Sequence, residues 1–280
     1  MTFGNRLKDT EEYVPQLYTP AMIRLDANES YADMPDEMKN KVLAEISAQS
    51  FNRYPDPAAN ALCKAFADYY GLYAANVVAG NGSDELISIM CSALLPSHSR
   101  VLVLSPDFSV YRIYANLYEN TVITVDKDEN LNFDIDNVIS VAKSRAVDLI
   151  IFSNPCNPTG QGITADEAEK IISSVNCAVC VDEAYMEFWS ENETVLPLIN
   201  KYENLIVLKT LSKAFGMAGF RLGFAVAGMD TVSLFRKAKM PYNVIVLSRA
   251  AGLAAMKNKE YLKSMTSQII ARKNMLYESV

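Results

Sequence analysis

The sequence contains very little histidine or tryptophan, with one residue of each among 280. The single histidine, His98, excludes a metal site built from several histidines and makes a Ser-His-Asp catalytic triad a poor candidate. His98 follows Pro96 and Ser97, where we expect a surface turn. The sequence therefore argues against the enzyme classes that depend on several histidines.

Long apolar runs and blocks of like charge are also absent. A membrane-spanning helix needs roughly 20 apolar residues, and no run is that long. The formal net charge is -7 and is spread along the chain, which argues against nucleic acid or an anionic membrane surface as the main partner. Residues 1–9 are polar and lack the apolar core of a signal peptide. We therefore expect a cytoplasmic location.

Cysteine is limited to five residues, an odd number, mostly within apolar runs. This pattern fits buried thiols in a reducing cytoplasm. Cys177 and Cys180 have the spacing of a redox motif, but the apolar segment around them resembles a buried strand. We expect both to be structural.

Apolar strand-like segments alternate with helical patterns along most of the chain, and half of all residues are hydrophobic. This composition provides for a large core, in one large domain or two smaller ones. The expected strands are 76–79, 101–104, 121–125, 149–152, 178–181, 205–208 and 222–227. The expected helices are 36–48, 58–70, 83–95, 109–117, 135–143, 231–239, 244–256 and 259–279, with one more that Thr164 begins through a capping box to Glu167. We predict an α/β fold with three layers (α/β/α) and a mostly parallel central sheet covered on both faces.

Several polar motifs follow the expected strands, where parallel sheets bind ligands. The segment 80–85 joins a strand to a helix, and its glycines and first-turn amides suit a phosphate. Ser83 is the expected helix cap, with Asp84 and Glu85 as the acidic first turn. The alternative is an ordinary capped turn without a ligand.

Three further motifs supply groups that suit an aromatic ligand. The rigid turn 153–160 directs Asn157 toward a cleft, unless it is a plain turn. Asp182 ends an apolar strand, where a carboxylate is costly without a cation such as a protonated pyridine nitrogen. Tyr185 follows three residues later, and Phe108, after another strand, offers a ring for stacking or belongs to the core.

Lys213 lies between the strand-like run 205–209 and a loop of small residues. A lysine here can form a Schiff base with an aldehyde cofactor. The hydroxyls of Thr210 and Ser212 and the guanidinium of Arg221 can hold a phosphate. The alternative is a basic surface loop.

Six strings, taken together and in order, resemble those of the fold-type-I pyridoxal-phosphate aminotransferases. The chain resembles the histidinol-phosphate aminotransferase family most. The strings occupy residues 25–29, 53–57, 80–85, 154–160, 182–185 and 210–223.

The resemblance implies pyridoxal 5′-phosphate as the cofactor, and it assigns roles to residues. Lys213 would bind the cofactor aldehyde covalently and then act as the catalytic base. Asp182 would hold the pyridine nitrogen protonated, and Asn157 and Tyr185 would hydrogen-bond the ring hydroxyl. Phe108 would stack on the ring.

The resemblance also implies a phosphate site and a homodimer. The cofactor phosphate would be held by Gly82, Ser83, Asp84, Thr210, Ser212 and Arg221. Tyr54 would reach the phosphate of the cofactor in the partner subunit.

The activity that the resemblance implies is transamination between a small-molecule amino donor and an oxo-acid acceptor. In that family histidinol phosphate or imidazole-acetol phosphate reacts with 2-oxoglutarate or glutamate in histidine biosynthesis. Related alternatives are an aromatic aminotransferase and a threonine-phosphate decarboxylase. A cofactor-binding but catalytically silent homologue is the alternative from a different class.

The same resemblance implies a division into domains. Residues 1–35 would form an arm or small-domain segment, 36–256 the large cofactor-binding domain, and 257–280 an interdomain helix. The family's C-terminal small domain supplies an arginine for the substrate carboxylate, and Arg272 does not match it. We therefore expect the small domain to be largely missing, with a complete cofactor site, no carboxylate site and exposed apolar surface.

Overall fold

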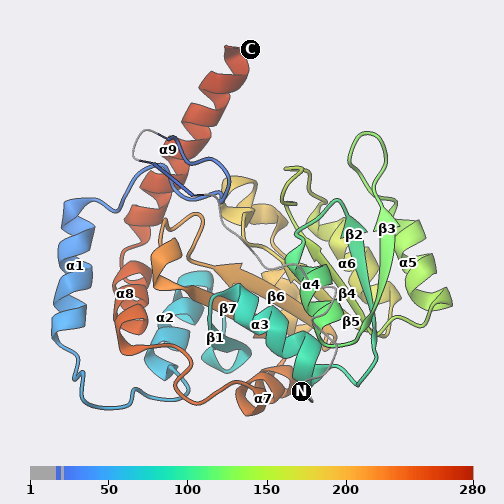
Figure 1. Cartoon of the computed structure of the whole chain (residues 1–280), viewed down its shortest axis with the longest axis horizontal. Helices are drawn as coiled ribbons and strands as arrows, with labels where there is room; N and C mark the ends of the chain where they lie inside the picture. The colour runs from blue at the N-terminus through green and yellow to red at the C-terminus, as the bar shows by residue number, and fades with distance from the viewer. Residues whose placement is uncertain (1–16, 20–21, 280) are drawn as a thin grey trace.

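The computed structural model describes residues 17–19 and 22–279. Its core is a seven-stranded sheet with the strand order β1-β7-β6-β5-β4-β2-β3 (Figure 1). The strands are β1 (Val77–Asn81), β2 (Arg100–Ser105), β3 (Thr121–Asp126), β4 (Leu149–Ser153), β5 (Ala178–Asp182), β6 (Leu205–Thr210) and β7 (Leu222–Ala227). Each lies where the apolar runs predicted a strand.

Strand direction divides the sheet into two parts. The neighbouring strands from β3 to β6 pair in parallel, whereas β7 pairs antiparallel with both β6 and β1. The mostly parallel sheet is therefore confirmed. The last residues of β4, β5 and β6 are Ser153, Asp182 and Thr210, and they end at the same edge.

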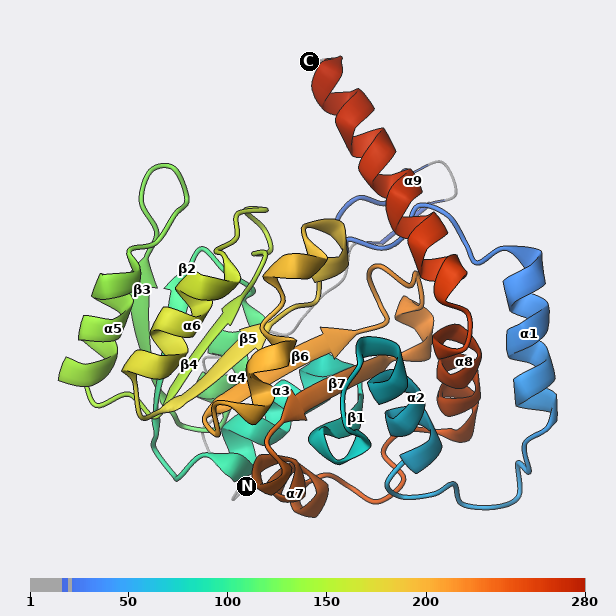
Figure 2. The same ribbon diagram turned by 180° about the vertical axis from the view of Figure 1, so that it is seen from behind.

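Helices cover both faces of this sheet (Figures 1 and 2). The α-helices of the described chain are α1 (Asp36–Ser47), α2 (Asn60–Tyr70), α3 (Ser83–Ile89), α4 (Val110–Leu117), α5 (Ile135–Ser144), α6 (Ala165–Ser174), α7 (Met229–Ala238), α8 (Val246–Met256) and α9 (Lys259–Glu278), of which α2 to α8 supply the covering layers. Because successive strand residues point to opposite faces, Val101 and Val103 pack with α3, α4 and α7, whereas Leu102 and Leu104 belong to the core that includes residues of α2, α5, α6 and α8. The three-layer prediction is confirmed.

Local hydrogen bonds explain where two of these helices begin. The hydroxyl of Thr164 accepts the amide of Glu167, and the Glu167 carboxylate accepts the amide of Thr164, so α6 has the predicted capping box. Asp134 caps α5 by accepting the amides of Asp136 and Asn137. These caps satisfy amides that have no partner inside a helix.

The prediction that Ser83 caps α3 is wrong. Gly82 is the capping residue, with a φ of 84°, and no side chain caps the helix. Ser83 is instead the first helical residue. The amide of Asn81 donates to Glu85 Oε2 at 2.6 Å, so a carboxylate in the first turn of the helix is the hydrogen-bond partner of the backbone just before α3. The helix continues as one π-helical segment, Met90–Leu94, close to its predicted end.

The two ends of the described chain lie outside the three layers. α1 packs beside α8, and α9 projects away from the sheet in both views (Figures 1 and 2). The outer end of α9 exposes Met275, Leu276 and Tyr277. Residues 1–16, which include the polar segment analysed for a signal peptide and part of the predicted arm, lie outside the described residues.

Within residues 17–19 and 22–279, no helix combines the length and the apolar character needed to cross a membrane.

The minor features predicted for His98 and the cysteine pair agree with the structure. His98 is exposed in a turn with a φ of 59°. Cys180 is buried in β5 and Cys177 directly precedes that strand, and both are free thiols. Burial raises the pKa of Cys177 to about 11 and that of Cys180 well above its ordinary value, which disfavours the reactive thiolate.

Candidate active site

A cavity of ≈ 290 Å³ opens at the edge where β4, β5 and β6 end. Ten of the predicted site residues line it: Ser83, Asp84, Phe108, Asn157, Asp182, Tyr185, Thr210, Ser212, Lys213 and Arg221. They come from segments that are far apart in the sequence. The topology therefore brings most of the predicted site together in one place.

Lys213 reaches this cavity from the loop that follows β6. Its Nζ donates to the carbonyl oxygen of Ala27 at 2.9 Å and lies 5.6 Å from the centre of the Tyr185 ring. Burial lowers the pKa of Lys213, although the carboxylates of Asp84 and Glu29 act in the opposite direction. A lower pKa increases the fraction of neutral amine, which is the nucleophilic form that attacks an aldehyde.

Asp182 is a buried carboxyl group at the end of β5, 3% exposed. The hydroxyl of Tyr111 donates to its Oδ2 at 2.8 Å, and the amide of Ala184 donates to Oδ1 at 3.1 Å. Burial raises the pKa of Asp182 to about 7 in spite of these hydrogen bonds. Among the described residues it forms no ion pair, so a protonated ring nitrogen would supply the missing cation.

Asn157 and Tyr185 are bridged by a residue that the sequence reasoning did not assign to the site. Asn28 Nδ2 lies 3.3 Å from Asn157 Oδ1 and 3.2 Å from the Tyr185 hydroxyl. Asn28 has a φ of 49°, a left-handed conformation that asparagine tolerates. Burial raises the pKa of Tyr185, so its hydroxyl keeps its proton for donation.

Phe108 and Tyr111 form the aromatic wall of the cavity. Their rings meet edge to face, with centroids 5.5 Å apart and an interplanar angle of 83°. Phe108 is half-buried and also packs on the core, so both of the sequence-based alternatives describe part of its position. Tyr111 was not predicted as a site residue; its only signal is that a buried tyrosine hydroxyl needs a hydrogen-bond partner.

Another part of the cavity lining is suited to an anion. The first residues of α3, Ser83 and Asp84, line it, and the helix N-terminus presents free amides. Arg221 Nη2 lies 3.0 Å from Asp84 Oδ2. Gly82 does not line the cavity, but a Cβ at this position would stand 2.7 Å from Arg221 Nη2. The absence of that side chain makes room for the guanidinium.

Thr210 lines the cavity, but its hydroxyl is engaged in the turn that leads to Lys213. It donates to the carbonyl oxygen of Leu222 at 3.2 Å and accepts the amide of Ser212 at 3.1 Å. Thr210 therefore holds the shape of the turn, whereas Ser212 brings a second hydroxyl to the cavity.

β7 connects the two halves of this anion site. Gly223 pairs with Thr210 of β6 on one side and with Gly80 of β1 on the other. A Cβ at Gly223 would collide with the backbone nitrogen of Ser83. The lack of a side chain therefore lets the strand touch the start of α3.

Tyr54 and Arg272 lie away from this cavity. Tyr54 is 82% exposed, and its ring stacks on that of Tyr242 at a centroid distance of 4.7 Å. Because Tyr54 is exposed, it is free to contact the cofactor phosphate of a partner subunit, and this role stays a prediction. Arg272 lies over the ring of Tyr31, 4.0 Å from its centroid.

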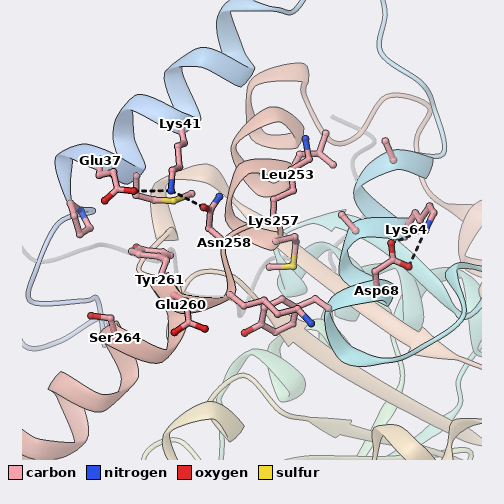
Figure 3. A pocket seen from close by; sticks show the side chains of 17 residues that line it. Glu37, Lys41, Lys64, Asp68, Leu253, Lys257, Asn258, Glu260, Tyr261 and Ser264 are labelled. Atoms are coloured by element: carbon pink, nitrogen blue, oxygen red, sulfur yellow. Dashed lines mark hydrogen bonds and ion pairs between the residues drawn. The ribbon is translucent and has the colours of Figure 1, made fainter.

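A larger cavity of ≈ 1090 Å³ lies between α1, α2, α8 and α9 (Figure 3). Its charged side chains are largely paired with each other: Lys41 with Glu37 at 2.9 Å and Lys64 with Asp68 at 2.7 Å. Such exposed pairs do not create reactive groups, so the smaller cavity is the better candidate site. Within the described part of the chain, no group of three or more His, Cys, Asp or Glu residues is placed to hold a metal ion.

The residues of the smaller cavity fit pyridoxal phosphate. Lys213 would bind its aldehyde carbon, and Asp182 its ring nitrogen. The amides of Ser83 and Asp84, with Arg221, would bind its phosphate. The fit is supported by the unpaired buried carboxylate of Asp182 and by the anion site that the glycines open.

Comparison with known proteins identifies the group to which this site belongs. Residues 20–280 match the model of the aminotransferase class I and II family. The chain is 40% identical to the histidinol-phosphate aminotransferase of Clostridium novyi over 258 residues, and this match covers 92% of this chain and 72% of that protein. It is 36% identical over 271 residues to that of Chlorobium phaeovibrioides, with 97% and 75% covered.

Solved structures show the same fold. The histidinol-phosphate aminotransferase of Clostridium acetobutylicum has a TM-score of 0.82 at 24% identity, covering 90% of this chain and 75% of that one. That of Sinorhizobium meliloti, in complex with pyridoxal-5′-phosphate, has a TM-score of 0.80 at 23% identity, with 87% and 66% covered. The chain therefore belongs to the class I and II aminotransferases, as a pyridoxal-phosphate-dependent aminotransferase of fold type I that resembles the histidinol-phosphate aminotransferases.

Proposed function

We propose that this chain transfers an amino group between histidinol phosphate and 2-oxoglutarate, a step of histidine biosynthesis. The observation that carries the proposal is the cavity that gathers Lys213, Asp182, Asn157 and Tyr185 around an anion site. Relatives up to 40% identical that are named histidinol-phosphate aminotransferases support the choice of substrate.

The roles of the side chains follow from their chemistry. Bound pyridoxal phosphate supplies the electron sink for the carbanion that forms at the substrate Cα. Asp182 would hold a proton on the ring nitrogen, which strengthens that sink. Asn157 and Tyr185 would orient the ring through its hydroxyl. Lys213, whose amine lies in the same cavity, would serve as the base that takes and returns the proton at the substrate Cα.

The test is a half-reaction followed by absorbance. The holoenzyme is mixed with histidinol phosphate in the absence of an oxo acid. We expect the visible band of the lysine-bound cofactor to disappear and to return when 2-oxoglutarate is added, and steady-state kinetics should be ping-pong. An unchanged band with histidinol phosphate would contradict the proposal and support a silent cofactor-binding protein.

A substrate panel separates this function from two related ones. Aromatic amino acids test an aromatic aminotransferase, and threonine phosphate tests a decarboxylase that releases carbon dioxide. Both activities occur among proteins of this fold, in an aromatic aminotransferase of Pyrococcus horikoshii and an L-threonine-O-3-phosphate decarboxylase of Porphyromonas gingivalis, at 22% and 21% identity. Faster turnover of either substrate than of histidinol phosphate would reassign the chain.

We further propose that the active unit is a homodimer and that it works in the cytoplasm. Tyr54, exposed on the surface, would bind the phosphate of the cofactor in the partner subunit. Five free cysteines, four of them buried, suit a reducing compartment.

A further inference from the structure

A buried cluster of three charged side chains lies next to the segment that carries Asp182 and Tyr185. The side chains of Lys209, Glu183 and Glu187 are 3%, 0% and 7% exposed. Lys209 Nζ lies 2.6 Å from Glu187 Oε1 and 3.4 Å from Glu183 Oε2. Buried charges are costly unless they are paired, and none of the three side chains lines the cofactor cavity.

Neutral groups complete this cluster. Glu183 accepts the amide of Val195 at 2.7 Å and the hydroxyl of Thr194 at 2.6 Å. Glu187 accepts the hydroxyl of Tyr70 at 2.8 Å. Throughout the described residues, no buried side-chain nitrogen or oxygen lacks a hydrogen-bond partner. The cluster is therefore a closed network in which each carboxylate is held in place.

The ammonium group keeps the two carboxylates together. Burial lowers the pKa of Lys209, but attraction to Glu187 and Glu183 outweighs burial and the net shift is upward, so the lysine stays charged. Burial raises the pKa of Glu183, although Lys209 opposes this shift. Without the cation, two buried carboxyl groups would face each other beside the cavity that Glu187 and Lys209 line, where like charges repel.

The cluster connects two segments of the active site. Glu183 directly follows Asp182, and Glu187 stands two residues beyond Tyr185, so the two anchored glutamates bracket the tyrosine. Lys209 also donates to the carbonyl oxygen of Glu183, at 3.5 Å. The whole turn 182–187 is thus tied to a side chain of the neighbouring strand.

That neighbouring strand is β6, which leads to the catalytic lysine. Lys209 directly precedes Thr210, the last residue of β6. We propose that Lys209 is a positioning residue, which holds the turn 182–187 against β6 and so sets Asp182 and Tyr185 relative to Lys213 before pyridoxal phosphate binds. The proposal rests on the cofactor site of the proposed function and is independent of which amine the enzyme uses.

The single tryptophan provides a direct test on the protein without cofactor. Trp189 lies two residues after Glu187 and is 39% exposed, so its emission reports on this turn. In Lys209→Met we expect red-shifted emission and stronger quenching by acrylamide, because the turn loosens and exposes the indole ring to solvent. The dissociation constant for pyridoxal phosphate should rise about tenfold, equivalent to about 1.4 kcal/mol.

A third measurement separates positioning from general destabilisation. In the loaded enzyme, the pH midpoint of the visible absorbance band should shift in Lys209→Met, because Tyr185 no longer meets the ring hydroxyl correctly. Lys209→Arg retains the cation and should restore all three measurements toward those of the parent. Lys201→Met, which breaks the exposed pair between Lys201 and Glu169, is the matched control and should leave them unchanged.

Glu187→Gln gives the same information if Lys209→Met does not fold. It keeps the shape of the network and weakens only its charge, so we expect smaller changes in the same direction. Tryptophan emission and cofactor affinity equal to those of the parent, in Lys209→Met or in its substitute Glu187→Gln, would overturn the proposal. Because emission is measured without cofactor or substrate, failure of the proposed function does not affect this result.

Discussion

Asp182 shows how one buried residue couples the cofactor site to stability. Its pKa of about 7 in the folded chain exceeds the ordinary value of 3.8, so the folded protein binds this proton more tightly than the unfolded chain does. By linkage, the cofactor-free protein loses stability as pH rises from about 4 to about 7. The ionised Asp182 therefore destabilises the folded protein near neutral pH as long as no protonated ring nitrogen pairs with it.

Asp182→Asn should therefore stabilise the cofactor-free protein at pH 8 and not at pH 4. The pKa of Asp182 is raised from 3.8 to about 7, a rise of about three pKa units. Because one pKa unit corresponds to about 1.4 kcal/mol, the expected gain in unfolding free energy at pH 8 is on the order of 4 kcal/mol. Urea unfolding at both pH values measures it. The same variant should bind pyridoxal phosphate more weakly, since asparagine cannot stabilise a protonated ring nitrogen. An equal gain at both pH values would show that the carboxylate is not the cause.

Lys213→Ala should abolish the covalent link to the cofactor. After borohydride treatment, mass spectrometry should find the cofactor attached to the parent and not to the variant, and transamination should be lost. Lys257→Ala, which removes an exposed lysine paired with Glu45, is the control and should behave as the parent does. A fully active Lys213→Ala would refute the assignment.

Ten of the twelve residues chosen from the sequence line one cavity, because they lie at or after the ends of strands that share one edge, or, for Arg221, just before the antiparallel strand β7 that starts there. Asn28 and Tyr111 were not assigned to the site for a physical reason. Asn28 contacts Asn157 and Tyr185 across 129 and 157 residues of chain, and such contacts leave no periodic signal. Tyr111 occupies a core position of α4, where its ring gives the same pattern as any buried aromatic.

At the scale of elements, strands were easier to predict than helix ends. The inner strands are mostly apolar runs, because both faces of the sheet are covered there, whereas the edge strand β3 alternates buried and exposed residues. The start of α3 was wrongly assigned to a Ser83 cap, because Gly82 adopts a conformation with positive φ and Glu85 satisfies the preceding amide. The antiparallel direction of β7 was not predicted either, since its apolar run resembles those of the parallel strands.

The capping box of α6 provides a test at this scale. Thr164→Ala should lower the free energy of unfolding by about 1 kcal/mol, because it removes the side chain that accepts the amide of Glu167. Urea denaturation measures the change. Ser173→Ala, at an exposed position on the same helix, should leave stability unchanged or slightly higher. Equal effects of the two substitutions would argue against the cap.

At the scale of the whole molecule, the position of Tyr54 outside its own cavity makes a prediction about assembly. If each tyrosine serves the site of its partner, Tyr54→Phe on one subunit and Lys213→Ala on the other fall on the same site of a hybrid dimer and leave the second site intact. The two variants should each bind pyridoxal phosphate poorly, and their mixture after subunit exchange should recover part of the tight sites of the parent. Sedimentation should show dimers throughout. Monomers, or a mixture that binds as the simple average, would contradict this arrangement.

The strand β7 has a consequence for the choice of cofactor. Because Gly223 pairs with both Thr210 and Gly80 and touches Ser83, sheet hydrogen bonds fix the distance between the first amides of α3, the proposed phosphate site, and the turn that bears Lys213. The fixed spacing therefore selects ligands by the distance between their aldehyde carbon and their phosphate. Pyridoxal, which has no phosphate, should leave the phosphate part of the site unfilled and bind more weakly. An analogue with one extra methylene before its phosphorus should be too long to reach both parts of the site.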